Sequence, residues 1–427
     1  MKIAFVTARP PYPPDSGGRI RTFHLLREIC GLHDVTLITA SEKRGEEGEE
    51  VALNPLRAAI PRLAVQAVKI PPETRLNRIS RAVRNPFDSL PYTWTRYGHP
   101  RFIAHIRKAL RNQRYDLIHC DHVQVAHAFV GLSTPPRILN AHNVESVLIR
   151  RMADQTRPWW RKMAVRWQSS KTRTAERQRY RHFDRCLAVS DADAAEIERL
   201  SPGTAVSIVR NGVDLTHFTP DFNSGTPHLM VFTGAMDWRP NIDGATFFVR
   251  EILPRIRKHD PDAHLLVVGS NPSESLVRAL AAPFVRFTGS VEDVRPYLKQ
   301  ARLVVVPLRI GGGTRLKILE AWAVGRPVIS TTIGAEGLPV EDGKNIALAD
   351  SAEAFAQRAV ELLNDTSAAN PFGVAGRRVV EELFGWDRVA RTLLDAYEVT
   401  RNGRRGPALA GWVPSTATSD SGSPELR

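Results

Sequence analysis

Residues 303–330 read LVVVPLRIGGGTRLKILEAWAVGRPVIS, and this stretch decides the fold class. The apolar run Leu303–Pro307 predicts a buried strand, and the helical spacing of apolar residues over about 314–324 predicts a helix. The run Pro327–Ser330 predicts the next strand. A strand, a glycine-rich loop, a helix and a further strand in that order are typical of a parallel α/β sheet.

The same alternation extends over two halves of the chain. The other strand-like runs are Lys2–Ala8, Val35–Thr39, Asp116–Cys120, Arg137–Asn140 and Cys186–Ser190 in the first half, and Leu229–Thr233, His264–Gly269 and Val285–Thr288 in the second. Residues 41–100 carry acidic residues and several prolines, which favours a solvated insertion. We predict two α/β domains, 1–222 and 223–400, and a disordered tail, 401–427, which lacks a hydrophobic period.

The composition excludes several classes of protein. Hydrophobic residues make up 42% of the chain and charged residues 24%, as in soluble globular proteins. Three widely spaced cysteines exclude a disulfide framework and a cysteine-rich zinc site, and they favour a reducing compartment. No apolar run is long enough for a membrane span, so we expect a cytoplasmic protein.

The net charge of +14 lies entirely in the first half, where residues 1–220 hold 35 Lys and Arg against 21 Asp and Glu. Twelve of these basic residues fall within residues 150–185, in one or two predicted helices that also carry Trp159, Trp160 and Trp167. This favours an anionic membrane surface at the inner face of the plasma membrane, or an anionic glycan acceptor. A merely solvated helix explains the pattern equally well. No nucleic-acid-binding motif accompanies it, so we expect no nucleic-acid partner.

The glycine loop and the helix after it have the composition of an anion site. Glycines let a ligand approach the backbone closely, and the free N–H groups of a first helical turn favour anions. Thr314 suits the N-cap position. Arg315 and Lys317 oppose the helix dipole by about 0.3–1 kcal/mol each unless they bind an anion such as a phosphate. The alternative is a turn whose basic residues are solvated.

Glu320 lies further along the same predicted helix. Its carboxylate can accept hydrogen bonds from the vicinal hydroxyls of a ribose, or it can pair with Lys317 at i, i+3. Phosphate donors and a ribose acceptor on one helix describe a nucleotide-diphosphate site, at the sheet edge where open α/β sheets bind ligands.

The run Gly311–Leu338 resembles the donor-site signature of glycosyltransferase family 4. It contains Gly325-Arg326-Pro327-Val328-Ile329-Ser330 and Gly334-Ala335-Glu336-Gly337-Leu338. Further similar motifs are Gly17-Gly18, Val189-Ser190, Asn211-Gly212-Val213-Asp214 and Gly343-Lys344-Asn345. The resemblance covers about residues 1–400. It implies the GT-B fold, with two facing Rossmann-like domains and an interdomain cleft, and retaining, metal-independent sugar transfer.

The resemblance also implies a set of donor-binding residues: Gly17, Gly18, Asn211, Gly234, Gly313, Thr314, Arg315, Lys317 and Glu320. The sequence departs from the family at two places. The first of two family glutamates falls on Gly312, and the usual Arg and Lys after the first strand of the second domain fall at about Ala235 and Asn241. The resemblance is to a branch of the family with these departures, in which Arg315 and Lys317 bind the diphosphate in place of the usual Arg and Lys.

A second group of candidates lies in the first half. Asp121, between His119 and His122, aligns with the active-site histidine of the family, and His142 follows the next strand. We expect Asp121, His122, His142, Arg315 and Lys317 to be catalytic. Alternatively, Asp121 and His122 are polar loop residues, and His142 is a capping or core histidine. Asp191-Ala192-Asp193 has the spacing of a metal-binding motif, but acidic residues at a helix start explain it.

We therefore expect a hexosyltransferase of a bacterial polysaccharide-biosynthesis branch. Its substrate is a nucleotide-diphosphate sugar, it needs no cofactor or metal, and its acceptor is a glycan or a lipid-linked molecule. One rival is a nucleotide-sugar epimerase of the same architecture. Another is a non-catalytic subunit that binds nucleotide sugar or glycan. A dinucleotide-dependent oxidoreductase is a less favoured alternative, because the Gly17-Gly18 loop lacks the Gly-x-Gly-x-x-Gly fingerprint.

Overall fold

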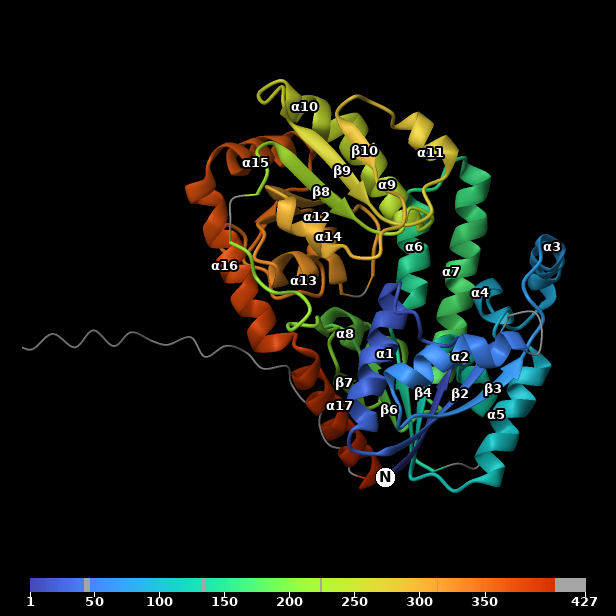
Figure 1. Cartoon of the computed structure of the whole chain (residues 1–427). Helices are drawn as coiled ribbons and strands as arrows, with labels where there is room; N and C mark the ends of the chain where they lie inside the picture. The colour runs from blue at the N-terminus through green and yellow to red at the C-terminus, as the bar shows by residue number, and fades with distance from the viewer. Residues whose placement is uncertain (42–46, 133–134, 223–224, 313, 404–427) are drawn as a thin grey trace, which may run out of the picture.

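The computed structural model describes residues 1–41, 47–132, 135–222, 225–312 and 314–403. Two α/β domains, each built on one parallel sheet, lie one above the other in Figure 1. The N-terminal sheet has the order β3-β2-β1-β4-β5-β6-β7. Its strands are β1 (Lys2–Thr7), β2 (Asp34–Ser41), β3 (Ala64–Lys69), β4 (Leu117–Asp121), β5 (Arg137–Asn140), β6 (Arg185–Ala188) and β7 (Val206–Ile208).

The C-terminal sheet repeats this arrangement with the order β10-β9-β8-β11-β12-β13. Its strands are β8 (Leu229–Thr233), β9 (His264–Val268), β10 (Val285–Phe287), β11 (Leu303–Val306), β12 (Val328–Ser330) and β13 (Ala347–Leu348). Each sheet reverses its strand order beside its first strand, which is the Rossmann-like topology. The predicted fold class, α/β with two Rossmann-like domains, is confirmed.

Helices cover both faces of each sheet. In the first domain they are α1 (Gly17–Cys30), α2 (Glu47–Ala59), α3 (Arg75–Arg84), η1 (Asn85–Phe87), α4 (Tyr92–Thr95), α5 (Pro100–Asn112), η2 (Val123–Phe129), α6 (Glu145–Asp154), α7 (Trp159–Tyr180) and α8 (Asp191–Leu200). In the second part of the chain they are α9 (Arg239–Phe247), η3 (Phe248–Ile252), α10 (Leu253–Arg257), α11 (Glu274–Ala279), α12 (Arg295–Gln300), α13 (Leu316–Ala323), α14 (Thr332–Ala335), α15 (Ala352–Asn364), α16 (Thr366–Leu383) and α17 (Trp386–Arg401).

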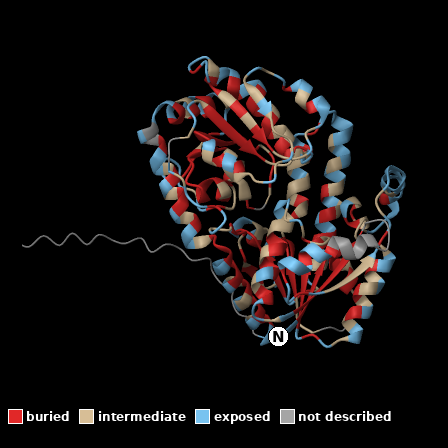
Figure 2. Ribbon diagram, in the orientation of Figure 1, coloured by how far each residue is buried: buried red, intermediate tan, exposed pale blue. Residues whose placement is uncertain are grey.

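The central strands are continuous apolar runs because helices bury both of their faces. All four residues of β11 are fully buried, and the strands form the buried interior of both domains in Figure 2. Every strand-like run predicted from the sequence contains a strand. The three missed strands, β3, β7 and β13, all lie at sheet edges, where burial is weaker and the apolar run shorter. The expectation of a solvated insertion over 41–100 is thus wrong for β3, which pairs with β2.

The last helix crosses back to the first domain. Buried residues of α17 pack in the same apolar cluster as β1 and α1. The Trp386 ring stacks on His24 with ring centres 4.8 Å apart, and the Tyr397 hydroxyl hydrogen-bonds His119 Nδ1 at 2.8 Å. Residues 386–400, which we assigned to the C-terminal domain, therefore complete the core of the N-terminal one, and Arg401, which we assigned to the disordered tail, is the last residue of α17. Of the predicted disordered tail, residues 404–427 lie outside the described residues.

Candidate active site

The two predicted halves of the site meet where the carboxyl ends of the two sheets face each other. Thr314 Oγ1, after β11, donates a hydrogen bond to the carbonyl oxygen of Val189, after β6, at 3.1 Å. A Cβ placed on Gly17, after β1, would lie 3.4 Å from Leu316 Cδ1 at the start of α13. The glycine loop of one domain therefore touches the helix start of the other.

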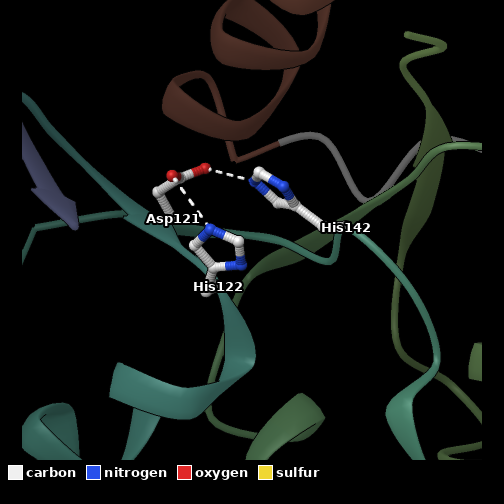
Figure 3. Close-up of side chains that lie close together, drawn as sticks. All are labelled: Asp121, His122 and His142. Carbon is white, nitrogen blue, oxygen red and sulfur yellow. Dashed lines mark hydrogen bonds and ion pairs between the residues drawn. The ribbon is translucent and has the colours of Figure 1, made fainter. Parts of the chain in front are cut away.

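Three side chains converge in the N-terminal half (Figure 3). Asp121 ends β4, His122 follows it, and His142 comes two residues after β5. His142 Nε2 lies 2.8 Å from Asp121 Oδ1, and His122 Nε2 lies 3.7 Å from Asp121 Oδ2. The two imidazoles stack with ring centres 3.7 Å apart. A φ of 80° at His122 holds that residue in a left-handed conformation, which is rare for a residue with a side chain and frequent at functional sites.

The carboxylate of Asp121 is fully buried among hydrogen-bond donors. Besides His142, it accepts hydrogen bonds from Thr22 Oγ1 at 2.6 Å and from Asn140 Nδ2 at 2.8 Å. Burial alone would raise its pKa, but the neighbouring His142 and His122 hold the pKa well below its usual range. We therefore interpret Asp121 as a charged group that orients His142, in place of the catalytic role predicted for it.

A buried arginine braces this arrangement from behind. Arg21 donates to Asn140 Oδ1 at 2.9 Å and to Asn211 Oδ1 at 3.0 Å. Burial lowers the pKa of its guanidinium to about 10. Asn211, which we expected to bind the donor, is 8% exposed and belongs to this bracing network. His119 stacks on Phe5 in the core and is not part of the accessible site.

The helix α1 directs its N-terminus at the two imidazoles. Gly17 and Gly18 are its first residues, and the N-cap Ser16 makes no side-chain hydrogen bond to them. The first N–H groups of a helix have no intrahelical partner. A Cβ on Gly18 would lie 3.5 Å from His122 Cε1 and 3.6 Å from His142 Nδ1. Glycine therefore keeps the space between the helix start and both rings open.

In the C-terminal half, Lys317 projects to the carboxyl end of β8. Its Nζ donates to Asn241 Oδ1 at 2.9 Å and lies 4.3 Å from the centre of the Phe232 ring. A Cβ on Gly234 would lie 2.9 Å from this Nζ. Asn241 stands at about the position where the family has a lysine. The ammonium of Lys317 reaches the side chain of this Asn241 from α13. Burial, reinforced by Arg315, lowers the pKa of Lys317 to about 7.

Arg315 stabilises the glycine loop. It occupies the N-cap position of α13 that we predicted for Thr314. Its guanidinium donates to the carbonyl oxygens of Gly312 and Ile333, the second at 3.3 Å. A Cβ on Gly311 would lie 1.7 Å from Arg315 Nη2, so this side-chain conformation of Arg315 requires a glycine at position 311. Burial lowers the pKa of Arg315 to about 10.

Glu320 lies one turn beyond Lys317 on α13 and is half-buried. Burial raises the pKa of its carboxyl group to about 7, against the lowering effect of Lys317. The alternative ion pair between the two side chains is absent from the described part of the chain, where the ammonium bonds Asn241 instead. The carboxyl group of Glu320 likewise has no hydrogen bond within those residues. Gly313, another predicted donor ligand, lies outside the described residues.

Arg151 connects the two domains through contacts that were not predicted from the sequence. Arg151, on α6, donates to Gly311 O at 2.6 Å and forms a bidentate ion pair with Glu336, in which Nη2 lies 2.7 Å from Oε1. Glu336 is part of the family motif, but Arg151 has no local sequence signal because the partners are 185 positions apart.

Two groups of residues bear on the prediction that no metal is needed. Asp191 and Asp193 open α8 behind the N-cap Ser190, as predicted. The ligand atoms of Asp121, His122 and His142 all lie within 4.8 Å of one another. Two imidazoles and a carboxylate are chemically suited to a transition metal. The expectation that no metal is needed stays a prediction.

Comparison with known proteins gives matches over both domains. Residues 16–217 match the family model "Glycosyltransferase Family 4", and residues 227–365 match "Glycosyl transferases group 1". An uncharacterised 44.6 kDa protein in the cps region of Klebsiella pneumoniae is 21% identical, over 91% of this chain and 97% of its own. A GDP-mannose-dependent monoacylated alpha-(1-6)-phosphatidylinositol monomannoside mannosyltransferase of Corynebacterium glutamicum is 31% identical, over 43% of this chain and 53% of its own.

The fold is also similar to solved structures. The Anabaena protein HepE, in complex with UDP and glucose, aligns with a TM-score of 0.66 and 14% sequence identity, over 93% of this chain and 99% of its own. With the parallel sheets of both domains, this similarity confirms the two-domain GT-B fold.

Proposed function

The chain belongs to glycosyltransferase family 4 and is a glycosyltransferase, and we propose that it transfers a hexose from a nucleotide-diphosphate sugar, with retention, to a glycan or lipid-linked acceptor. The observation that carries this proposal is the position of Lys317. Its ammonium, with Asn241 as its hydrogen-bonding partner, lies on the helix whose start touches the glycine turn of α1.

The leaving diphosphate is stabilised from both domains. Lys317 supplies a positive charge from α13, and the amides of Gly17 and Gly18 supply hydrogen-bond donors at the positive end of the α1 dipole. Preorganised donors of this kind contribute about 3–4 kcal/mol each to the transition state. Arg315 contributes indirectly, because it holds the glycine loop against α14.

His142 is the side chain best placed to contact the transferred sugar. Because Asp121 is ionised, it fixes the hydrogen of the imidazole on Nε2, and the lone pair of Nδ1 points towards Gly18. In the reaction the acceptor oxygen forms a bond to C1 of the sugar, the bond from C1 to the phosphate oxygen breaks, and the acceptor proton passes to the departing diphosphate. Retention is supported by the family membership.

The acceptor is proposed from the relatives. The Klebsiella protein is named for its place in the cps region, and the Corynebacterium enzyme is named for a phosphatidylinositol mannoside acceptor. Both support a role in the assembly of a cell-surface polysaccharide on a lipid-linked acceptor.

The proposal is tested by thermal denaturation with UDP-, GDP- and ADP-sugars. Because a ligand that binds the native state raises its stability, at least one sugar nucleotide should raise the melting temperature of the wild type. The Lys317→Met variant should lose most of this shift and keep its fold by circular dichroism. The proposal is wrong if no sugar nucleotide shifts the wild type, or if Lys317→Met responds equally.

Two rival functions are separated by NMR of the sugar nucleotide. An epimerase would change the donor sugar with no acceptor present, and a non-catalytic subunit would leave the donor unchanged under all conditions. A transferase releases nucleoside diphosphate and forms a glycoside whose anomeric coupling matches that of the donor.

A further inference from the structure

The short helix α3 stands away from the first domain and exposes an apolar stripe. None of its residues is buried, and Figure 2 shows it exposed along its length at the right edge of the molecule. Leu76 is 78% exposed, Ile79 53% and Val83 68%. At about 100° per residue, the three side chains fall within about 60° of one another. Phe87, in the following turn η1, is 93% exposed.

The rest of α3 is positively charged. The helix carries four arginines and no acidic residue. Arg81 pairs with Glu73, whereas Arg75, Arg78 and Arg84 form no ion pair with any of the described residues. Helical spacing places Arg75 and Arg84 at the two borders of the apolar stripe. An exposed apolar stripe bordered by arginines is the pattern of a helix that lies in the interface of an anionic bilayer.

A second exposed surface adjoins α3 through α7. Gln168 Nε2, on α7, donates to Asn85 Oδ1 in η1 at 2.7 Å, and Lys171 donates to the carbonyl oxygen of the same residue. One residue before Gln168, Trp167 is 45% exposed. The contacts with Asn85 therefore place the turn that carries Phe87 beside the exposed Trp167.

We propose that α3, with Phe87 and the exposed tryptophans of α7, docks the protein on an anionic lipid bilayer. The apolar side chains enter the headgroup region, and the arginines bind lipid phosphates. Combining insertion with charge gives stable peripheral binding, which either contribution alone rarely provides. Among the described residues no helix is long and apolar enough to cross a membrane. From the sequence, the basic helix α7 was a candidate for a membrane or anionic-glycan contact, with a merely solvated helix as the alternative. The proposal takes the membrane contact and includes α3 as its apolar part.

The chain segment after α3 lies beside the loop that follows β1. The segment after α3 leads through α4 to Tyr97, whose ring centre lies 5.7 Å from the guanidinium carbon of Arg9, two residues beyond β1. This position would let a lipid-linked acceptor reach the first domain from the bilayer. Only that consequence rests on the proposed function, since the docking itself requires no transfer reaction.

The experiment is co-flotation of the full chain with vesicles. Vesicles of phosphatidylcholine and phosphatidylglycerol should carry the protein upward, and vesicles of phosphatidylcholine alone should carry much less. Leu76→Asp combined with Ile79→Asp should lower the partition coefficient by about tenfold for each side chain that no longer inserts. Arg75→Gln and Arg84→Gln should each lower it about fivefold.

Leu32→Asp is the matched control. Leu32 is an aliphatic side chain that is 66% exposed, in the turn that follows α1 next to the chain's N-terminus. This variant should float like the wild type. Since no residue of α3 is buried, its variants should keep the melting temperature and the response to sugar nucleotide, which separates lost docking from unfolding and from failure of the proposed function.

Two results would overturn the proposal. The first is that the wild type fails to float with anionic vesicles, or that the α3 variants float as well as the wild type. The second is a dimer in sedimentation velocity that Leu76→Asp dissociates, because α3 would then cover a second copy of the chain instead of a bilayer.

Discussion

Raising the pH should weaken the binding of the sugar nucleotide, because the proposed phosphate ligand Lys317 is close to neutrality in the empty protein. Burial, with a smaller effect of Arg315, lowers its pKa from 10.5 to about 7. A diphosphate stabilises the charged ammonium. Above pH 7 the protein must therefore take up a proton when the ligand binds, and the affinity falls as the pH rises.

The magnitude follows from this pKa. With a value of about 7, about one quarter of the Lys317 side chains are protonated at pH 7.5 and about one thirtieth at pH 8.5. The dissociation constant should therefore rise about eightfold over that interval. Glu320, with a pKa raised to about 7 by burial, is mostly ionised throughout the interval and changes the slope little. Below pH 7 its protonation removes a ribose acceptor, so affinity should also fall on the acidic side.

Isothermal titration calorimetry in two buffers of different ionisation enthalpy measures both the affinity and the proton uptake. The wild type should take up close to one proton per ligand at pH 8.5. Lys317→Arg is the matched control, because an arginine stays charged across this range and should remove both the slope and the uptake. A wild-type affinity that is flat between pH 7.5 and 8.5, or an equal slope in Lys317→Arg, would refute the reasoning.

Four further predictions concern the same site. Lys317→Met should stabilise the empty protein by up to about 4 kcal/mol at pH 7.5, because the lowered pKa makes the buried ammonium destabilising in full below pH 7 and progressively less so towards pH 10.5. Urea denaturation at pH 7.5 and 9.5 should show the difference from the wild type shrinking to about 1 kcal/mol, and a growing difference would contradict the sign. Asp121→Asn should lower kcat by about a hundredfold or more, since His142 loses the charge that fixes its hydrogen on Nε2. It should also lower the melting temperature, because a buried carboxylate whose pKa is lowered by folding stabilises the native state. A kcat within twofold of the wild type would argue against this role. Gly311→Ala should displace the Arg315 guanidinium, which would lie 1.7 Å from the new methyl group, and reduce sugar-nucleotide affinity in the same calorimetric assay. Gly98→Ala is the control, because a Cβ there would lie no closer than 3.4 Å to its neighbours, an ordinary contact distance. Turnover should be unchanged after dialysis against EDTA, whereas a loss that zinc or manganese restores would instead favour a metal at Asp121, His122 and His142.

Much of the fold was predictable because it depends on local pattern. Apolar runs such as Leu303–Pro307 are buried on both faces wherever the sheet places them, so their sequence alone predicts central strands. The half-buried edge strand Ala64–Lys69 has no such run and was missed. Helix α17 was assigned to the wrong domain, because its apolar stripe does not specify which core it covers.

The site divides in the same way. The sequence by itself determined which residue types stand at the carboxyl ends of the strands, so motif and order along the chain were enough to propose Gly18, His142 and Lys317 for this edge. Only the tertiary structure decided that Asp121 is enclosed by donors, that Arg315 folds onto its own loop, and that Arg151 reaches Glu336. The reason is physical: a strand or a turn is set by neighbours in sequence, whereas burial, hydrogen-bond saturation and charge pairing depend on groups that folding brings together from distant parts of the chain.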